Sequence, residues 1–315
     1  MEGDVSKIVS KYAKICPTHL TDGLFVPKRK KAAKTDIERI YDGGIIHFMG
    51  FAQLSGFDQT VLFAVCARAG IEGLYLLGDK DDLKNQYTLF PMLLEEKLER
   101  KSAVTESAIT YEKVTAYSLL KDIGKADGKR NYRLLIDSLK RLSNITVYRE
   151  KNGQGGSMNM LSFAHDKFKN IQISLNWRLA GAILGEQQNV QVSITERLEI
   201  PSAAGKILHA WCSGYLKRGG DHFFEQGISY EKLCQHVWGE KVFDDLSKQR
   251  KSDRIQSLKK ALKEINKLEW WTVKLGKTKA HIKRPKNAPW IEEIVGTPGE
   301  IEDLYISQTS LEYRT

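Results

Sequence analysis

Lysine and arginine side chains recur along two amphipathic stretches of this chain, and their chemistry is the binding of phosphates and base edges. In the first stretch, apolar residues at three- and four-residue spacing predict a helix that is buried on one side: Tyr132, Leu135, Ile136, Leu139 and Leu142. The opposite side carries Arg130, Arg133 and Arg141. A basic helix of this kind fits the major groove of DNA, although a single one is also typical of an ordinary solvated surface.

The second stretch repeats this pattern near the C-terminus. Residues 248 to 267 hold eight Lys or Arg residues against Asp253 and Glu264. Their predicted core face is Ile255, Leu258, Leu262, Ile265 and Leu268. Ser257 and Lys260 point away from that face, where a DNA-reading surface would lie.

The elements that position these residues also occur twice. The segment Ile109-Thr110-Tyr111-Glu112-Lys113 returns 119 residues later as Ile228-Ser229-Tyr230-Glu231-Lys232. A short helical pattern, the basic helix and a two-stranded hairpin follow each copy. That order predicts an α+β fold with two tandem winged-helix domains that carry short β-hairpin wings.

Each hairpin has a basic tip. The first is expected at 144–149 and 158–163, with its turn at 151–156, and the second at 271–275 and 280–283, with its tip at 276–279. The helices and hairpin tips together give the candidate DNA-binding residues: Lys129, Arg130, Arg133, Arg141, Lys151, Lys248, Arg250, Lys251, Arg254, Ser257, Lys260, Lys277, Lys279 and Arg284.

The rest of the chain divides by composition and periodicity. We expect an N-terminal basic arm over 1–40, a first winged-helix domain over 41–185, a second over 186–287 and an acidic C-terminal tail over 288–315. The first domain should include a strand at 45–49 and a helix with Asp58 as its N-cap. Between the repeats, strands are expected at 171–175 and 190–194, with a helix at 177–184, and a further helix should begin near Pro201. The tail carries six acidic residues against Arg314; it could compete with DNA, dock a partner or simply be solvated.

Bulk properties agree with a nucleic-acid partner. The 315 residues carry a formal charge of +10, and 41% of them are apolar, which is enough to bury a core in two domains. A basic chain attracts polyanions because each neutralised phosphate releases condensed counterions. No apolar run has the length of a membrane span and the N-terminus lacks a signal-peptide core, so we expect a cytoplasmic protein with no membrane partner.

Enzymatic and metal-binding motifs are weak. Gly276-Lys277-Thr278 resembles the end of a phosphate-binding loop but lacks its earlier glycine. Asp79, Asp81 and Asp82 could hold a metal, yet such clusters commonly form turns. The four cysteines lack paired spacing, and a site of His209, Cys212, Cys234 and His236 can be drawn only with diverging side chains. We therefore expect no enzyme activity, no metal and no cofactor.

Short segments spread over the chain resemble the replication protein C family of IncQ-type plasmids, whose members are iteron-binding initiators. The similarity runs from Gly23 to Pro285. The segments that carry it are Gly23-Leu24-Phe25, the stretch from Val104-Thr105 through Ser118 to Gly124, Ser193-Ile194, Leu208-His209, Trp211 to Gly214, Leu233-Cys234, Val237-Trp238, Trp271 to Val273, Ile282 and Arg284-Pro285.

This resemblance implies an initiator that binds direct repeats in duplex DNA at a plasmid origin, opens adjacent AT-rich DNA and recruits a replicative helicase. Self-association stays an open question. Two other functions also remain open: a transcriptional repressor that acts on its own promoter, and a primase or nuclease that uses the acidic cluster.

Overall fold

Two hydrophobic cores organise the molecule. The structure is a computed structural model that describes residues 12–28, 33–76, 114–167, 169–184, 187–239 and 245–285. Its helices are η1 (Pro17–Leu20, a 3-10 helix), α2 (Gly56–Leu76), α3 (Ala116–Asp122), α4 (Lys129–Ser143), α5 (Trp177–Leu184), α6 (Ile194–Glu199), α7 (Ala203–Tyr215), α8 (His222–Glu225), α9 (Tyr230–Trp238) and α11 (Lys248–Ile265). Its strands are β1 (Tyr12–Ile15), β2 (Phe25–Val26), β3 (Thr35–Tyr41), β4 (Gly44–Gly50), β5 (Leu54–Ser55), β6 (Val114–Thr115), β7 (Ile145–Lys151), β8 (Gln154–Asn159), β9 (Leu161–His165), β10 (Asn170–Leu175), β11 (Val190–Ser193), β12 (Ile228–Ser229), β13 (Thr272–Leu275) and β14 (Lys279–Lys283).

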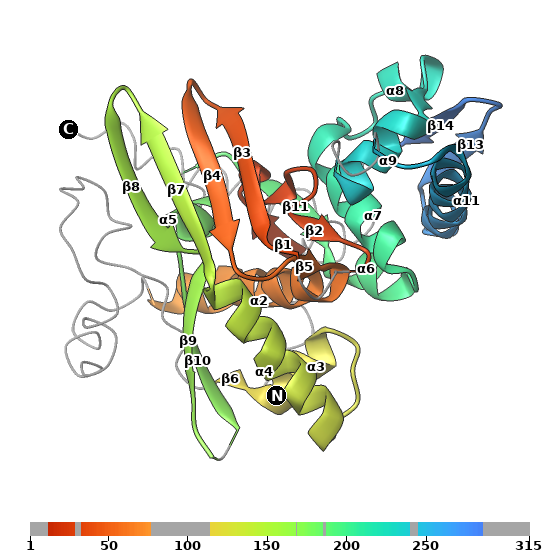
Figure 1. The fold of residues 1–315 in the computed structure, drawn as a ribbon. Coiled ribbons are helices and arrows are strands. Elements are labelled where there is room, and N and C mark those ends of the chain that lie inside the picture. Colours follow the sequence, from red (N-terminus) through yellow and green to blue (C-terminus); the bar gives the residue numbers. More distant parts are fainter. Residues whose placement is uncertain are drawn as a thin grey trace, which may run out of the picture.

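The long helix α2 is the centre of the first core (Figure 1). Its apolar residues from Val61 to Ala69 are buried, and α3, α4, α5 and α7 all contact it. A helix that is apolar nearly all round must be covered on every side. The four-stranded sheet β3-β4-β7-β8 extends away from α2 at one end of the molecule, as Figure 1 shows.

The same arrangement of elements occurs twice. The first unit, defined as α2, β6, α3, α4, β9 and β10, has a three-stranded sheet of order β6-β10-β9. The second unit, defined as α7, β12, α9, α11, β13 and β14, has the matching order β12-β14-β13. In both units a helix precedes a two-residue strand, two helices follow, and the hairpin closes the sheet. The mixed helix and strand content confirms the expected combination of α and β elements.

The residues that carry the repeat differ from those in the sequence prediction. Ile109–Lys113 lies outside the described residues. The counterpart of β12 is β6, because each is antiparallel to the last strand of its hairpin. Each also ends on an N-cap hydroxyl: Thr115 accepts from the backbone N–H of Ser118, and Ser229 accepts from that of Lys232.

The first hairpin is also displaced from its predicted position. Strand β7 pairs with β4 along six residues and with β8 on its other side, so the expected wing at 144–163 belongs to the four-stranded sheet. The hairpin that pairs with β6 is β9–β10, about fifteen residues later in the chain. The sequence prediction was wrong here because β7 directly follows the basic helix, whereas the hairpin that pairs with β6 begins only after β8.

The N-terminal segment is not the polar arm that composition suggested. Strand β1 pairs antiparallel with β11, and Ala13 and Ile15 are fully buried in the first core. Strand β2 pairs parallel with β5. Of the basic run at 27–31, only Pro27 and Lys28 are described. Residues 12–26 therefore belong to the first core, whose apolar side chains compensate for the loss of backbone entropy.

The remaining predicted elements agree with the structure. The strand at 45–49 is β4, and the elements predicted at 171–175, 177–184 and 190–194 are β10, α5 and β11. Helix α2 begins at Gly56, so Asp58 lies in its first turn and Ser55 precedes the helix. The acidic tail lies outside the described residues.

Candidate nucleic-acid interface

Helix α4 presents a basic outer face in the first unit. It follows Gly128, and its inner residues Leu135, Leu139 and Leu142 are fully buried. The turn that precedes it is closed by a hydrogen bond from the Asn131 side chain to the Ala126 carbonyl (2.8 Å). The side chains of Lys129, Arg130 and Arg133 are exposed, as predicted. Lys140 is also exposed on this helix, as is the acidic Asp137.

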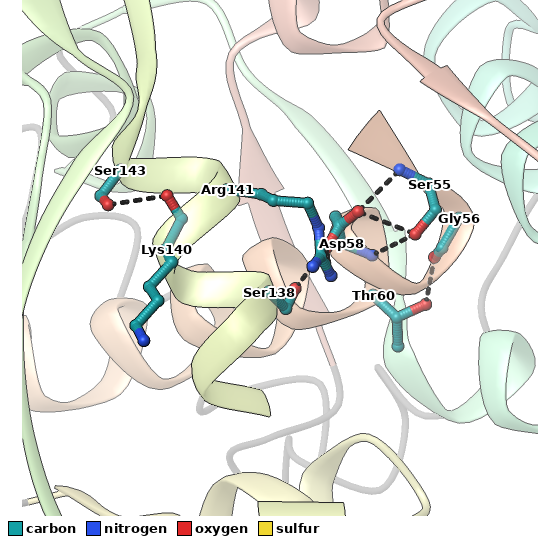
Figure 2. A network of polar contacts seen from close by, with 8 residues as sticks. All are labelled: Ser55, Gly56, Asp58, Thr60, Ser138, Lys140, Arg141 and Ser143. Carbon is teal, nitrogen blue, oxygen red and sulfur yellow. Dashed lines mark hydrogen bonds and ion pairs between the residues drawn. The ribbon is translucent and has the colours of Figure 1, made fainter. Parts of the chain in front are cut away.

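Arg141 lies on the other side of the same helix and has a structural contact. Its Nε and Nη2 donate to one carboxylate oxygen of Asp58, at 3.0 and 2.7 Å. The Ser138 hydroxyl donates to the same oxygen (2.6 Å), and Ser55 donates to the second oxygen from its backbone N–H and its hydroxyl (Figure 2). The Asp58 side chain is fully buried. We therefore correct the assignment of Arg141: it joins α4 to α2 rather than facing solvent.

Helix α11 is the corresponding basic helix of the second unit. Its inner face of Leu258, Ala261, Leu262 and Ile265 is fully buried. The exposed side chains include four predicted candidates, which are Lys248, Arg250, Ser257 and Lys260. Gln249 donates to Asp253 one turn later (3.0 Å), so that carboxylate is already hydrogen-bonded.

Two further candidates on α11 are less accessible. Lys251 and Arg254 are both half-buried. The guanidinium of Arg254 lies 4.7 Å from the centre of the Trp238 ring, and burial lowers the pKa of Arg254. A cation over an indole face is attracted to it electrostatically. Arg254 therefore holds α11 against α9 and keeps only part of its surface for a ligand.

The second hairpin carries a basic tip beside the start of α9. The Tyr230 hydroxyl donates to the Gly276 carbonyl (2.8 Å), and the Tyr230 N–H donates to the Thr278 carbonyl (3.1 Å). These two hydrogen bonds fix the tip against the start of α9. Lys277 is exposed there, and Lys279 donates to the Gln226 carbonyl (3.3 Å).

The tip of the first hairpin holds residues that the sequence prediction missed. The turn between β9 and β10 contains Lys167 and Lys169, and Asp166 accepts from the Asn170 N–H (2.9 Å) and side-chain amide (2.7 Å). Lys169 is 3.9 Å from an Asp127 oxygen. The sequence signal that could have identified this hairpin is the alternation of apolar and polar residues on both sides of Asp166. Lys151, in contrast, lies at the far end of β7 and pairs with Asp42 (2.8 Å), so the structure does not bring it to α4 or α11.

Arg284 is a further candidate whose side chain has partners within the protein. Its guanidinium donates to the backbone carbonyls of Ser213 and Gln191. Burial lowers its pKa to about 10. Arg284 thereby ties the end of β14 to α7 and β11, and its donors are directed at the protein backbone.

The two histidines of the metal site considered from sequence have other partners. His209 is hydrogen-bonded to Glu196 (2.7 Å) and His236 to Asp22 (2.6 Å), while the four cysteines are buried and free. Within the described ranges, no group of three or more His, Cys, Asp and Glu side chains could hold a metal ion. Asp79, Asp81 and Asp82 lie outside those ranges. None of the described helices has the length and apolar character needed to cross a membrane.

Comparisons with known proteins give a family match and solved structures of similar fold. The family model described as Replication protein C (RepC) matches residues 10–286. A crystal structure of domains 2 and 3 of RctB is similar, with a TM-score of 0.51 and 12% identity, and the match covers 87% of this chain and 100% of that one. A second structure of RctB domains 2 and 3 has a TM-score of 0.43 at 11% identity, with 80% and 85% covered. No curated protein matches the chain in sequence.

Proposed function

Because the chain belongs to the replication protein C family, we propose that it initiates DNA replication by binding direct repeats in duplex DNA at a replication origin. The observation that carries this proposal is the duplicated arrangement of strand, two helices and hairpin. In both copies the second helix has a buried apolar face and an exposed basic face. One basic helix is commonly just a solvated surface, whereas two with the same neighbours favour a repeated ligand.

We propose that each unit acts as a winged helix. In that mode α4 and α11 enter the major groove, where side chains near the helix N-terminus meet base edges. Lys129, Arg130 and Arg133 lie in the first turns of α4, and Lys248 and Arg250 begin α11. The hairpin tips with Lys167 and Lys277 then contact the adjacent backbone. Two such helices would occupy successive major grooves, about 34 Å apart on one face of the duplex.

The later steps of initiation follow from family membership. Members of the family are expected to open AT-rich DNA beside the repeats and to recruit a replicative helicase. Smooth bending of a site of 20 to 30 base pairs costs about 1–6 kcal/mol, and the phosphate contacts of two basic units can offset that cost. Bent DNA beside such a site would open more readily. Self-association on neighbouring repeats is compatible with this scheme.

The experiment that tests the proposal is duplex binding across a salt series, with tandem repeats from an origin compared with a scrambled sequence. We expect repeat-selective binding with a steep salt dependence. The variants Arg133→Ala and Arg250→Ala should each lower affinity, while Lys34→Ala, an exposed lysine at the start of β3, is the matched control. Equal affinity for both duplexes would refute sequence-specific initiation. Preference for a palindrome over tandem repeats would favour a repressor instead.

A further inference from the structure

Three cations meet at the junction of the two units, where α6 links them. Lys125 follows the end of α3, Arg197 lies in α6, and Lys206 lies near the start of α7. In Figure 1 α3 lies next to α4, whereas α6 and α7 lie on the side of α2 toward α11. Within the described part of the chain, no carboxylate forms an ion pair with any of the three.

Arg197 is the most deeply buried of the three cations. It is 1% exposed, and its guanidinium lies 4.7 Å from the centre of the Phe63 ring. Its partners are neutral: it donates to the Lys206 carbonyl (2.6 Å), the Gln59 side-chain carbonyl (3.0 Å) and the Thr60 hydroxyl (3.2 Å). No described atom accepts from its Nε. Burial lowers the pKa of Arg197 to about 9, as expected for a cation without a counter-charge.

Lys206 is in direct contact with Arg197 through its backbone, because its carbonyl accepts a hydrogen bond from the Arg197 guanidinium (2.6 Å). Burial, the charge of Arg197 and the charge of Lys125 together lower the pKa of Lys206 to about 8. Lys206 is half-buried, whereas lysine ammonium groups are normally well solvated. The fold therefore maintains a charge arrangement that costs free energy in the absence of an anion.

Lys125 is brought to the same place by a close packing contact. Gly124 has φ +69°, and a Cβ there would lie 2.9 Å from a methyl carbon of Leu198. Glycine lets the end of α3 rest on α6 at the residue next to Arg197. The Lys125 side chain is exposed, so it faces solvent at the edge of the cluster.

Carboxylates on α3, α6 and α11 have other partners or face solvent. Glu196 accepts from Trp271 (3.1 Å) and contacts His209, Glu264 accepts from Ser202, and Asp122 pairs with Arg68. Glu199 is exposed at the end of α6.

We infer that Lys125 and Lys206, with Arg197 beneath them, bind a phosphate of the DNA backbone that lies between the two segments read by α4 and α11. This inference rests on the proposed function. Lys125 precedes Lys129, the first residue of α4, by four positions, and Ser202 at the start of α7 contacts Glu264 of α11. A duplex that occupies both reading helices would run past the junction. A phosphate there would supply the counter-charge that the described residues lack.

The test uses the full chain and a duplex with tandem repeats. Each neutralised phosphate contributes about −0.9 to the slope of log K against log salt concentration. Lys206→Gln should make the slope shallower by about one unit, and Lys125→Gln should shift it in the same direction. Lys206→Arg should keep the slope of the natural chain, because it retains the charge. Lys34→Gln is the matched control for the loss of one exposed lysine.

Phosphate ethylation interference adds a positional readout. For the natural chain, ethylation of a phosphate between the two major-groove contact segments should block binding. That single position should stop interfering in Lys206→Gln, while the positions within both segments should still interfere. If Lys206→Gln fails to fold, the exposed Lys125→Gln variant gives the same readout.

The outcomes separate this inference from the proposed function. If the natural chain binds both duplexes equally, the proposed function fails. If the natural chain is repeat-selective but Lys206→Gln and Lys125→Gln keep its slope and interference pattern, the inference is overturned. A third arm adds inorganic phosphate in thermal unfolding: stabilisation that is lost in Lys206→Gln, together with unchanged DNA slopes, would assign the cluster to a free phosphate compound and would also overturn it.

Discussion

Replacing Arg141 by methionine should destabilise the protein and leave its DNA contacts intact. The two nitrogen atoms of Arg141 that donate to Asp58 are the cationic half of a buried ion pair between α2 and α4. Methionine keeps most of the aliphatic stem and removes only the charge and the donors. The change therefore tests whether Arg141 supports the fold or reads DNA, as its basic character first indicated.

The expected loss of stability depends on the hydrogen bonds that Asp58 retains in the variant. Breaking a buried ion pair by removing one partner costs about 3–5 kcal/mol, because the remaining charge is left in a poor environment. Asp58 would still accept from the Ser138 hydroxyl and from two donors of Ser55. We therefore expect the lower end, about 3 kcal/mol, which for a core of this size lowers Tm by about 6–12 °C.

The assay pairs urea unfolding with duplex binding at low temperature, where the variant remains folded. Arg133→Met is the matched control, since Arg133 is exposed on the same helix. It should change the free energy of unfolding by less than about 0.5 kcal/mol and should weaken DNA binding. If Arg141→Met instead lowers DNA affinity and its salt slope while unfolding at the same urea concentration as the natural chain, the structural role argued here is refuted.

Three further predictions concern other parts of the fold. Lys277→Gln should make the salt slope of DNA binding shallower by about one unit, whereas Lys151→Gln should leave it unchanged, because Lys151 pairs with Asp42 in the four-stranded sheet; equal effects would contradict the reassigned hairpin. Gly124→Ala should destabilise the protein by about 1 kcal/mol or more, since φ is +69° and the added Cβ would crowd Leu198; thermal unfolding measures this, and an unchanged Tm would rule out the close packing of α3 on α6. The pKa of Lys206 is lowered to about 8, so the unfolded chain binds the Lys206 proton more tightly than the folded chain does. The contribution of Lys206 to the free energy of unfolding therefore rises as the pH increases from about 8 to the ordinary lysine range. In urea unfolding, any stability advantage of Lys206→Gln over the natural chain at pH 7 should shrink by pH 10, and a constant difference would contradict the lowered pKa.

Helical periodicity made α4 and α11 predictable from sequence, and most of the apolar residues that it placed on their inner faces are buried. It could not identify which basic residues find partners inside the protein. Arg141 meets Asp58, which is 83 residues earlier in the chain, and Arg284 meets backbone carbonyls of two other elements. Long-range polar contacts of this kind depend on tertiary packing and leave no periodic signal.

The position of the hairpin in the first unit was the second feature that the sequence did not predict. β7–β8 and β9–β10 both follow α4, and both alternate apolar and polar residues. What distinguishes them is the partner strand: β4 for the first and β6 for the second. Because β6 has only two residues, its apolar pattern is too short to identify. The sequence repeat at Ile109 and Ile228 indicated a duplicated arrangement of elements, although the structural counterpart of Ile228-Ser229 is Val114-Thr115.

Helix α7 contributes buried residues to both hydrophobic cores, so packing contacts rather than a linker hold the two units in position. Ile207 and Ala210 are buried in the first core, while Leu208, Trp211 and Cys212 are buried in the second. Neighbouring residues of a helix point in different directions, so one helix can supply apolar surface to both cores. His236 of α9 adds a second contact, since it is hydrogen-bonded to Asp22 (2.6 Å) and stacks on Trp211 with ring centres 4.2 Å apart. A change in the relative position of α4 and α11 would therefore have to break buried contacts on both sides of α7, which favours a fixed spacing between the two segments of DNA that the proposed function assigns to them.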